Sequence, residues 1–231
     1  MRVSLDPAYI LHSRSFRESS LLLEAFSRTH GRVGLVARGA RGSRSKWKNM
    51  LQPFRPLLLS WSQRGELGTL SGADQVASPP MLAGEALFCG LYANELLMNF
   101  MHRSDPHPLL FEHYNQLATE LATGGSPQPC LRLFEKALLQ SCGFGLQLDH
   151  EHDSEQAIDA ASWYLYVPEE GPRRSEPGSG QSADLISGEA LLALKSGEIG
   201  ERHLKELKTL MRRLIAFYLG DRKLKSQSLF Y

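Results

Sequence analysis

Residues 20–38, SLLLEAFSRTHGRVGLVAR, decide the fold of the first part of this chain. Two apolar runs, 20–26 and 32–38, flank the turn Thr29-His30-Gly31. Short runs rich in apolar and β-branched residues, separated by turns that contain glycine, are typical of β-strands. The stretch therefore predicts two strands joined by a tight turn.

The same pattern extends in both directions. Residues 8–14 precede the stretch, and residues 51–62 and 65–70 follow it. Pro53 and Pro56 interrupt the run at 51–62, which fits an edge or bulged strand because proline cannot donate to a sheet ladder. Five short strands at this spacing predict a small barrel, either of the oligonucleotide-binding (OB) type or SH3-like. Strand number alone does not distinguish the two.

Beyond Ser78-Pro79-Pro80 the pattern becomes helical. Apolar spacing predicts helices at 81–102, 109–122, 127–142 and 202–219, and a strand at 163–167. Residues 168–183 are rich in Pro, Gly and Ser and predict a mobile loop. The expected fold is α+β, with a five-stranded barrel domain at 1–80 and a mainly helical domain at 81–231.

Charge divides the chain at the same place. The whole chain carries a formal charge of +1, but residues 1–80 hold 12 basic and 5 acidic residues, a net of +7. From Ala25 to Gly65 there are nine basic residues and no acidic one. A one-sided segment of this kind forms a positive surface, which favours polyanions such as nucleic acids. The alternative is a solvated loop that binds nothing.

Composition and motifs exclude several other classes. Three scattered cysteines and no CxxC argue against a disulfide framework or a cysteine-rich zinc site and indicate a reducing cytoplasm. The N-terminus lacks a signal peptide's pattern, and the most apolar segment, 81–101, contains two glutamates, which disfavours a membrane span. His150 and His152 are two residues apart and fit an acidic linker better than a metal site. No common catalytic motif is present.

The densest basic stretch, 38–48, supplies most candidate DNA contacts. Glycines and serines separate its charges, which indicates an exposed loop where the backbone can approach a phosphate. Trp47, between two lysines, either stacks on an unpaired base or folds back onto the barrel. Phe54 and Trp61 are expected in the core. The basic residues near 202–225 extend the cationic surface or form a solvated face.

Helix 127–142 offers a second candidate site. Arg132 and Lys136 lie one turn apart beside a stripe formed by Leu131, Phe134 and Leu138. This combination suits an acidic peptide with a hydrophobic end. The alternative is an ordinary amphipathic core helix in which Arg132 pairs with Glu135.

Several short motifs together resemble the bacterial recombination mediator RecO family. They are AYILH at 8–12 with Arg14, ESS at 18–20, GRV at 31–33, ARGAR at 37–41, LQPF at 51–54 and GEL at 65–67. Weaker matches follow at 143–144, 218–220 and 224–226. The N-terminal motifs are specific in combination and weak individually.

The resemblance implies an N-terminal OB fold, binding of single- and double-stranded DNA, and annealing of complementary strands. It also implies cooperation with RecR in loading RecA onto strands coated by single-strand-binding protein, whose acidic C-terminal tail the family binds. Many members carry a four-cysteine zinc site. This sequence lacks those cysteines, so we expect no metal and no cofactor, and residues 149–183 are either held by other means or mobile.

The sequence therefore predicts a cytoplasmic DNA repair and recombination mediator without catalytic residues and without membrane attachment. The alternatives are a nucleic-acid-processing enzyme and an adaptor that binds only proteins. We expect the partner tail at Leu131, Arg132 and Lys136. The predicted DNA-binding residues are Arg14, Arg38, Arg41, Arg44, Lys46, Trp47 and Lys48.

Overall fold

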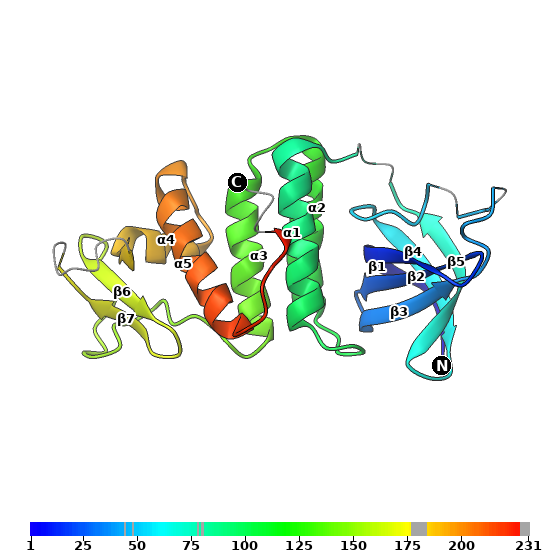
Figure 1. Ribbon diagram of the computed structural model, residues 1–231. Coiled ribbons are helices and arrows are strands. Elements are labelled where there is room, and N and C mark those ends of the chain that lie inside the picture. Colours follow the sequence, from blue (N-terminus) through cyan, green and yellow to red (C-terminus); the bar gives the residue numbers. More distant parts are fainter. Residues whose placement is uncertain (44, 48, 78, 80, 177–183, 227–231) are drawn as a thin grey trace. The chain divides into compact units, whose positions relative to one another are not determined.

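The computed structural model describes all 231 residues except 44, 48, 78, 80, 177–183 and 227–231 (Figure 1). The chain forms two compact units. Unit 1 consists of Met1–Gly125 and Leu224–Tyr231, and unit 2 of Ser126–Lys223. Within the described residues, no helix combines the length and the apolar character needed to cross a membrane.

Unit 1 begins with a closed five-stranded barrel. Its strands are β1 (Arg2–Phe16), β2 (Ser20–Ser27), β3 (Gly31–Ala37), β4 (Leu57–Gln63) and β5 (Leu67–Gln75). They close in the order β1-β2-β3-β5-β4, and only the β3–β5 pair is parallel. The OB-type barrel expected from the sequence is confirmed.

Alternating side chains fill the barrel. Ile10, Leu23, Leu35, Leu59 and Trp61 are fully buried, as expected for inward-facing strand positions. Trp61 is thus a core residue, as predicted. The strand expected at 51–62 begins only at Leu57, because Pro53 and Pro56 cannot donate to the ladder. Residues 52–56 before it are half-buried, so Phe54 is not the core residue that was expected.

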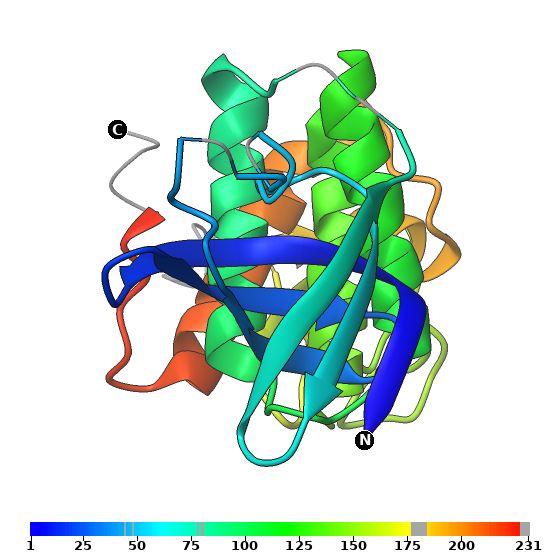
Figure 2. The same ribbon diagram turned by 90° about the vertical axis from the view of Figure 1, so that its right-hand side faces the viewer.

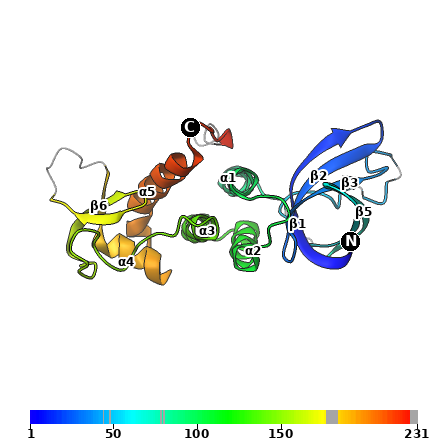
Figure 3. The same cartoon turned by 90° about the horizontal axis from the view of Figure 1, so that it is seen from below.

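Two helices pack on the barrel within unit 1. Helices α1 (Gly84–Phe100) and α2 (Pro108–Thr123) appear end-on in Figure 3, with β1 as the nearest strand. A register shift between Ile10 and His12 leaves the Leu11 carbonyl outside the β1–β2 ladder. The Asn94 side-chain amide of α1 donates to this oxygen at 2.9 Å. The helical hairpin after residue 80 is therefore tied directly to the barrel.

Unit 2 contains α3 (Pro127–Ser141), a small sheet and two further helices. The sheet has the order β7-β6-β8, with β6 (Trp163–Val167), β7 (Gly171–Arg174) and β8 (Leu185–Ser187). Helices α4 (Gly188–Ser196) and α5 (Glu201–Leu219) follow. The strand predicted at 163–167 is confirmed, and α3 and α5 match two predicted helices.

The loop expected at 168–183 is shorter than predicted. Residues 171–174 pair with β6, where Val167 faces Gly171 across a tight turn. Gly171 has φ of 110°, a conformation that glycine adopts without strain and that closes this turn. Residues 177–183 lie outside the described part of the chain.

Candidate nucleic-acid interface

Topology brings two basic segments to one end of the barrel. Because β1 and β2 are antiparallel, the turn at 17–19 lies at the end where β3 finishes and the β3–β4 segment, residues 38–56, begins. The β4–β5 turn lies at the opposite end, as Figure 2 shows with that turn at the bottom. We call the first of these the cationic end.

Hydrogen bonds join the two segments at the cationic end. The backbone N–H of Arg41 donates to the Ser19 carbonyl at 2.9 Å. The Arg41 guanidinium Nη1 donates to the carbonyls of Arg17 and Glu18, each at 3.2 Å. These acceptors are backbone oxygens, so Arg41 is held in place while its charge stays uncompensated.

Arg17 is a candidate that sequence reasoning missed. Its guanidinium carbon lies 5.2 Å from the centroid of the Phe16 ring, and its side chain is exposed. The contact places a cation beside a half-buried aromatic ring, next to Arg41. The only signal in the sequence was the Phe16-Arg17 pair between two strand-like runs. That signal indicates a binding residue only when β1 and β2 are known to form a hairpin.

The cations at this end face solvent. Within the described residues of unit 1, no carboxylate forms an ion pair with any of five exposed side chains: Arg14, Arg17, Arg38, Arg41 and Lys46. Arg44 and Lys48, also predicted to contact DNA, lie outside the described residues. The structure thus brings together the predicted cations that it describes, and none of them pairs with a carboxylate there, although exposed Glu18 lies in the same turn as Arg17.

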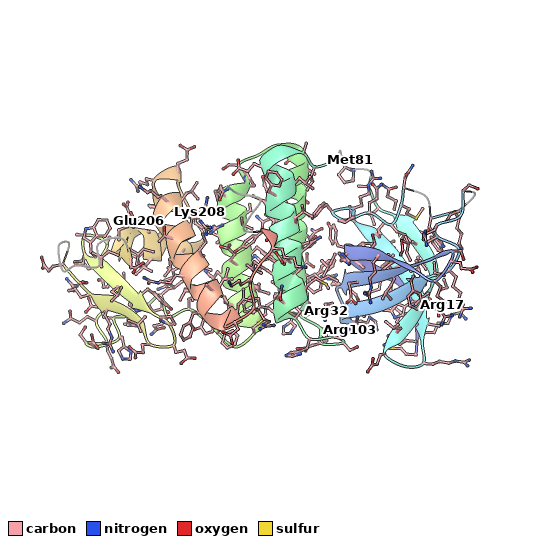
Figure 4. The ribbon with its side chains drawn as sticks, in the orientation of Figure 1. Arg17, Arg32, Met81, Arg103, Glu206 and Lys208 are labelled. Atoms are coloured by element: carbon pink, nitrogen blue, oxygen red, sulfur yellow. The ribbon has the colours of Figure 1, made fainter. Side chains whose placement is uncertain are left out.

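Two other arginines of the acid-free segment are paired elsewhere. Arg28 Nε lies 2.9 Å from Glu112 Oε1 on α2. Arg32 Nε lies 3.6 Å from Glu24 Oε2, and Glu24 also pairs with Arg103. Burial lowers the pKa of Arg32, partly offset by the Glu24 carboxylate. Figure 4 shows Arg32 and Arg103 together, apart from Arg17.

Trp47 corrects one part of the predicted site. Its side chain is 7% exposed and belongs to the barrel core, so the ring has folded back and does not face a base. An indole buries a large apolar area, which outweighs the charge of its neighbours. Lys46 Nζ lies 4.3 Å from the ring centroid. Trp47 therefore anchors the basic segment to the barrel.

The predicted partner-tail residues lie mostly inside unit 2. Leu131 and Arg132 are buried, and Arg132 Nη1 lies 2.9 Å from Glu135 Oε2, the pair expected for an amphipathic core helix. Lys136 Nζ donates to the carbonyls of Leu194 and Lys195, at 2.7 and 3.1 Å, and so caps the end of α4. Burial lowers the pKa of Lys136. Leu131 and Arg132, at 2% and 3% exposed, therefore do not lie on an open surface.

A hydrogen-bonded carboxylate supports residues 149–174 of unit 2. Buried Glu151 accepts from Ser154 Oγ at 2.6 Å, Arg174 Nε at 2.8 Å and Tyr164 Oη at 3.2 Å. These bonds, that from Ser154 first, lower the pKa of Glu151. Across the described residues, His, Cys, Asp and Glu side chains nowhere gather in a group of three or more that could hold a metal ion.

Comparisons with known proteins cover nearly the whole chain. The model described as Recombination protein O N terminal matches residues 1–79, and the one described as Recombination protein O C terminal matches residues 81–228.

Relatives named DNA repair protein RecO align over almost their full lengths. Those from Nitrosococcus oceani and Methylococcus capsulatus are each 46% identical, covering 99% of this chain and 93% of the relative. That from Coxiella burnetii is 41% identical, covering 100% and 99%. With both family models matched and this identity along its length, the chain belongs to the RecO family of DNA repair proteins.

Proposed function

We propose that this chain is a recombination mediator that binds single- and double-stranded DNA at the cationic end and anneals complementary strands. The observation that carries the proposal is the set of five exposed cations without carboxylate partners in the described residues of unit 1. Such a surface binds phosphates because each contact releases condensed counterions. Contacts to phosphates do not distinguish one base sequence from another, which suits a protein that must bind DNA of any sequence.

Annealing follows from the same electrostatics. Cations at the barrel end offset the repulsion between two phosphate backbones and let complementary strands approach. Backbone contacts leave the base edges free to pair. No bond is made or broken in this mechanism, so the proposed role is not enzymatic.

The proposal extends to partners through the family. We infer that the chain cooperates with RecR, binds the C-terminal tail of single-strand-binding protein, and helps to load RecA on coated strands. In unit 2, Arg132 Nη1 pairs with Glu135, whereas its buried Nε has no hydrogen-bond acceptor in the described residues. A buried guanidinium with an unfilled donor supports a carboxylate ligand there, reached by local opening of the helix.

Annealing of complementary strands coated with single-strand-binding protein tests the central proposal. We expect the chain to accelerate annealing, and Arg38→Ala with Arg41→Ala to slow it. The same double variant should make the salt dependence of DNA binding shallower by roughly 2 in log–log slope, at about 0.9 per phosphate contact.

A matched control sits at the other end of the barrel. Arg2 and Arg64 are also exposed, so Arg2→Ala with Arg64→Ala removes the same charge there. This variant should retain the parent affinity and slope. Equal losses in both double variants would mean that net charge, and not the cationic end, drives binding.

The tail proposal has its own test. An acidic peptide ending in phenylalanine should bind the parent chain and lose affinity in Arg132→Ala. Arg202→Ala, which removes an exposed cation paired with Glu189 on the neighbouring helix, is the control. Thermal unfolding of Arg132→Ala shows whether the unit remains folded. Unchanged peptide binding in a folded Arg132→Ala protein would refute the assignment.

A further inference from the structure

An apolar hollow of about 310 Å³ lies within unit 1, between the last part of the β3–β4 segment and α1. One wall is residues 52–55 of the β3–β4 segment, and the other is formed by apolar side chains of the linker and α1, among them Met81, Leu87 and Leu91. Figure 4 labels Met81, whose side chain is 77% exposed. This volume is at the small end of ligand sites and accommodates one flat ring system. We call it the Phe54 hollow.

Phe54 holds an unusual backbone conformation at this place. Its φ is 65°, in the left-handed region that is unfavourable for a residue other than glycine. The ring is fixed against Gly90 of α1, where an added Cβ would lie 2.7 Å from the ring. The same ring also lines a second hollow on the α2 side. A strained backbone conformation at a residue that lines an open hollow is typical of ligand-binding sites.

Local hydrogen bonds connect the hollow to the basic segment. The Met50 N–H donates to the Trp47 carbonyl at 3.1 Å, and the Gln52 N–H donates to the Met50 carbonyl at 2.9 Å. These two bonds tie Met50 and Gln52 to the buried Trp47. Lys46 precedes these bonded residues and the hollow-lining residues 52–55 follow them, so few residues of chain separate this cation from the hollow.

The lining chemistry selects among occupants. An apolar floor with an aromatic ring suits a flat aromatic group, and no carboxylate lines the hollow. Arg55 at its rim forms no ion pair within the described residues of unit 1 and suits a phosphate. Gln52 offers an amide that can donate to and accept from a base edge. A nucleobase attached to a phosphate backbone fits all three features.

Base pairing determines whether a base from a single strand or from a duplex can enter the Phe54 hollow. A base inside a duplex is stacked and paired, so it must be extruded before it can enter a pocket, whereas a base in a single strand is free. We infer that the Phe54 hollow takes one unpaired base of a strand held at the cationic end. This inference rests on the proposed function and adds a contact that single strands can make and intact duplexes cannot.

Phe54→Leu is the first test, because it removes the aromatic face and keeps an apolar side chain. We expect single-strand affinity to fall about 5-fold or more, the loss of stacking on one base, with duplex affinity within about 2-fold of the parent. Phe217→Leu, an exposed aromatic of unit 2, is the matched control and should change neither. A strand containing 2-aminopurine reports stacking through its fluorescence, which Phe54→Leu should alter and Phe217→Leu should not.

Leu91→Trp tests the hollow without touching Phe54. Leu91 is 36% exposed, so a larger ring there fills the hollow from the α1 side. We expect the same selective loss of single-strand affinity. Duplex binding retained by both variants shows that the barrel and its charges are intact.

The outcomes separate the two proposals. A single-strand to duplex ratio that stays at the parent value in both Phe54→Leu and Leu91→Trp overturns the base-binding inference. If Arg38→Ala with Arg41→Ala still weakens binding to both DNA forms, the proposed function stands by itself. If that double variant leaves affinity and salt slope unchanged, the proposed function fails, whatever the Phe54 variants do.

Discussion

The two ends of the barrel use the same residue type for different purposes. At the cationic end, Arg17 and Arg41 are exposed, and their neighbours in the described structure are carbonyls and an aromatic ring. Toward the other end, Arg28 and Arg32 face Glu112 and Glu24. The difference lies in the carboxylates that the fold supplies.

The second end is also fixed by a buried acid. Asp6 accepts hydrogen bonds from the hydroxyls of Ser27 and Thr29, which hold the β2–β3 turn. The Gly31 Cα faces the Asp105 backbone so closely that a Cβ would lie 1.9 Å from its carbonyl oxygen. Arg28 and Arg32 there hold the barrel to the helices and to Glu24, whereas Arg2 and Arg64 at the same end are exposed. Cations that form ion pairs with carboxylates must therefore be left out before a count of cations can indicate a binding surface.

Removing the anchor of the cationic end should have the largest effect. Trp47→Ala leaves a cavity in the barrel core and should lower the free energy of unfolding by about 3–5 kcal/mol. Urea unfolding measures the change. Trp47→Phe, which keeps an apolar ring, should recover most of it and retain DNA affinity. A stable Trp47→Ala protein that loses only single-strand binding would instead make Trp47 a base-stacking residue.

Glu24→Ala should have the next largest effect. It leaves Arg32 and Arg103 without their carboxylate in a half-buried site, at a cost of about 3 kcal/mol in unfolding free energy. DNA affinity of the folded protein should stay near the parent value, because these cations remain away from the cationic end. A strong gain in affinity would mean that pairing, and not position, excludes them from DNA.

Much of this arrangement was readable in the sequence. Alternating apolar runs and glycine turns specify β2 and β3, and the 3-4 spacing of Leu207, Met211 and Leu214 specifies α5. The absence of acids from 25 to 65 pointed to the cationic end. Each of these signals is local, so neighbouring residues suffice to show it.

What the sequence did not reveal depends on contacts distant along the chain. Trp47 between lysines looks exposed until the barrel offers it a core position. Arg17 joins the cationic end because its carbonyl accepts a hydrogen bond from Arg41. Asn94 ties α1 to the barrel because the Leu11 carbonyl, at the register shift of β1, accepts from its amide. Phe54 needs the missing side chain of Gly90. Such partners are chosen by tertiary packing, which no local pattern records.

Arg17→Ala should change binding and leave stability alone. An exposed cation that contacts one phosphate contributes a salt slope of about 0.9, and its loss should weaken DNA binding about 3- to 5-fold at low salt. The free energy of unfolding should change by less than about 0.5 kcal/mol. Fluorescence anisotropy over a salt series measures the slope. A slope equal to that of the parent would remove Arg17 from the interface.

Glu112→Gln should have the smallest effect on stability. It tests directly whether the position of a cation or the total charge governs DNA binding. It frees Arg28 by removing a half-exposed partner, and such surface pairs contribute at most about 1 kcal/mol to stability. The variant adds one uncompensated cation at the end opposite Arg41. If position governs binding, the salt slope stays at the parent value; if total charge governs it, the slope steepens by about 0.9. The same measurement on Glu112→Gln combined with Arg28→Ala is the control, because this double variant removes the freed cation, restores the parent's net charge and should match the parent under either rule.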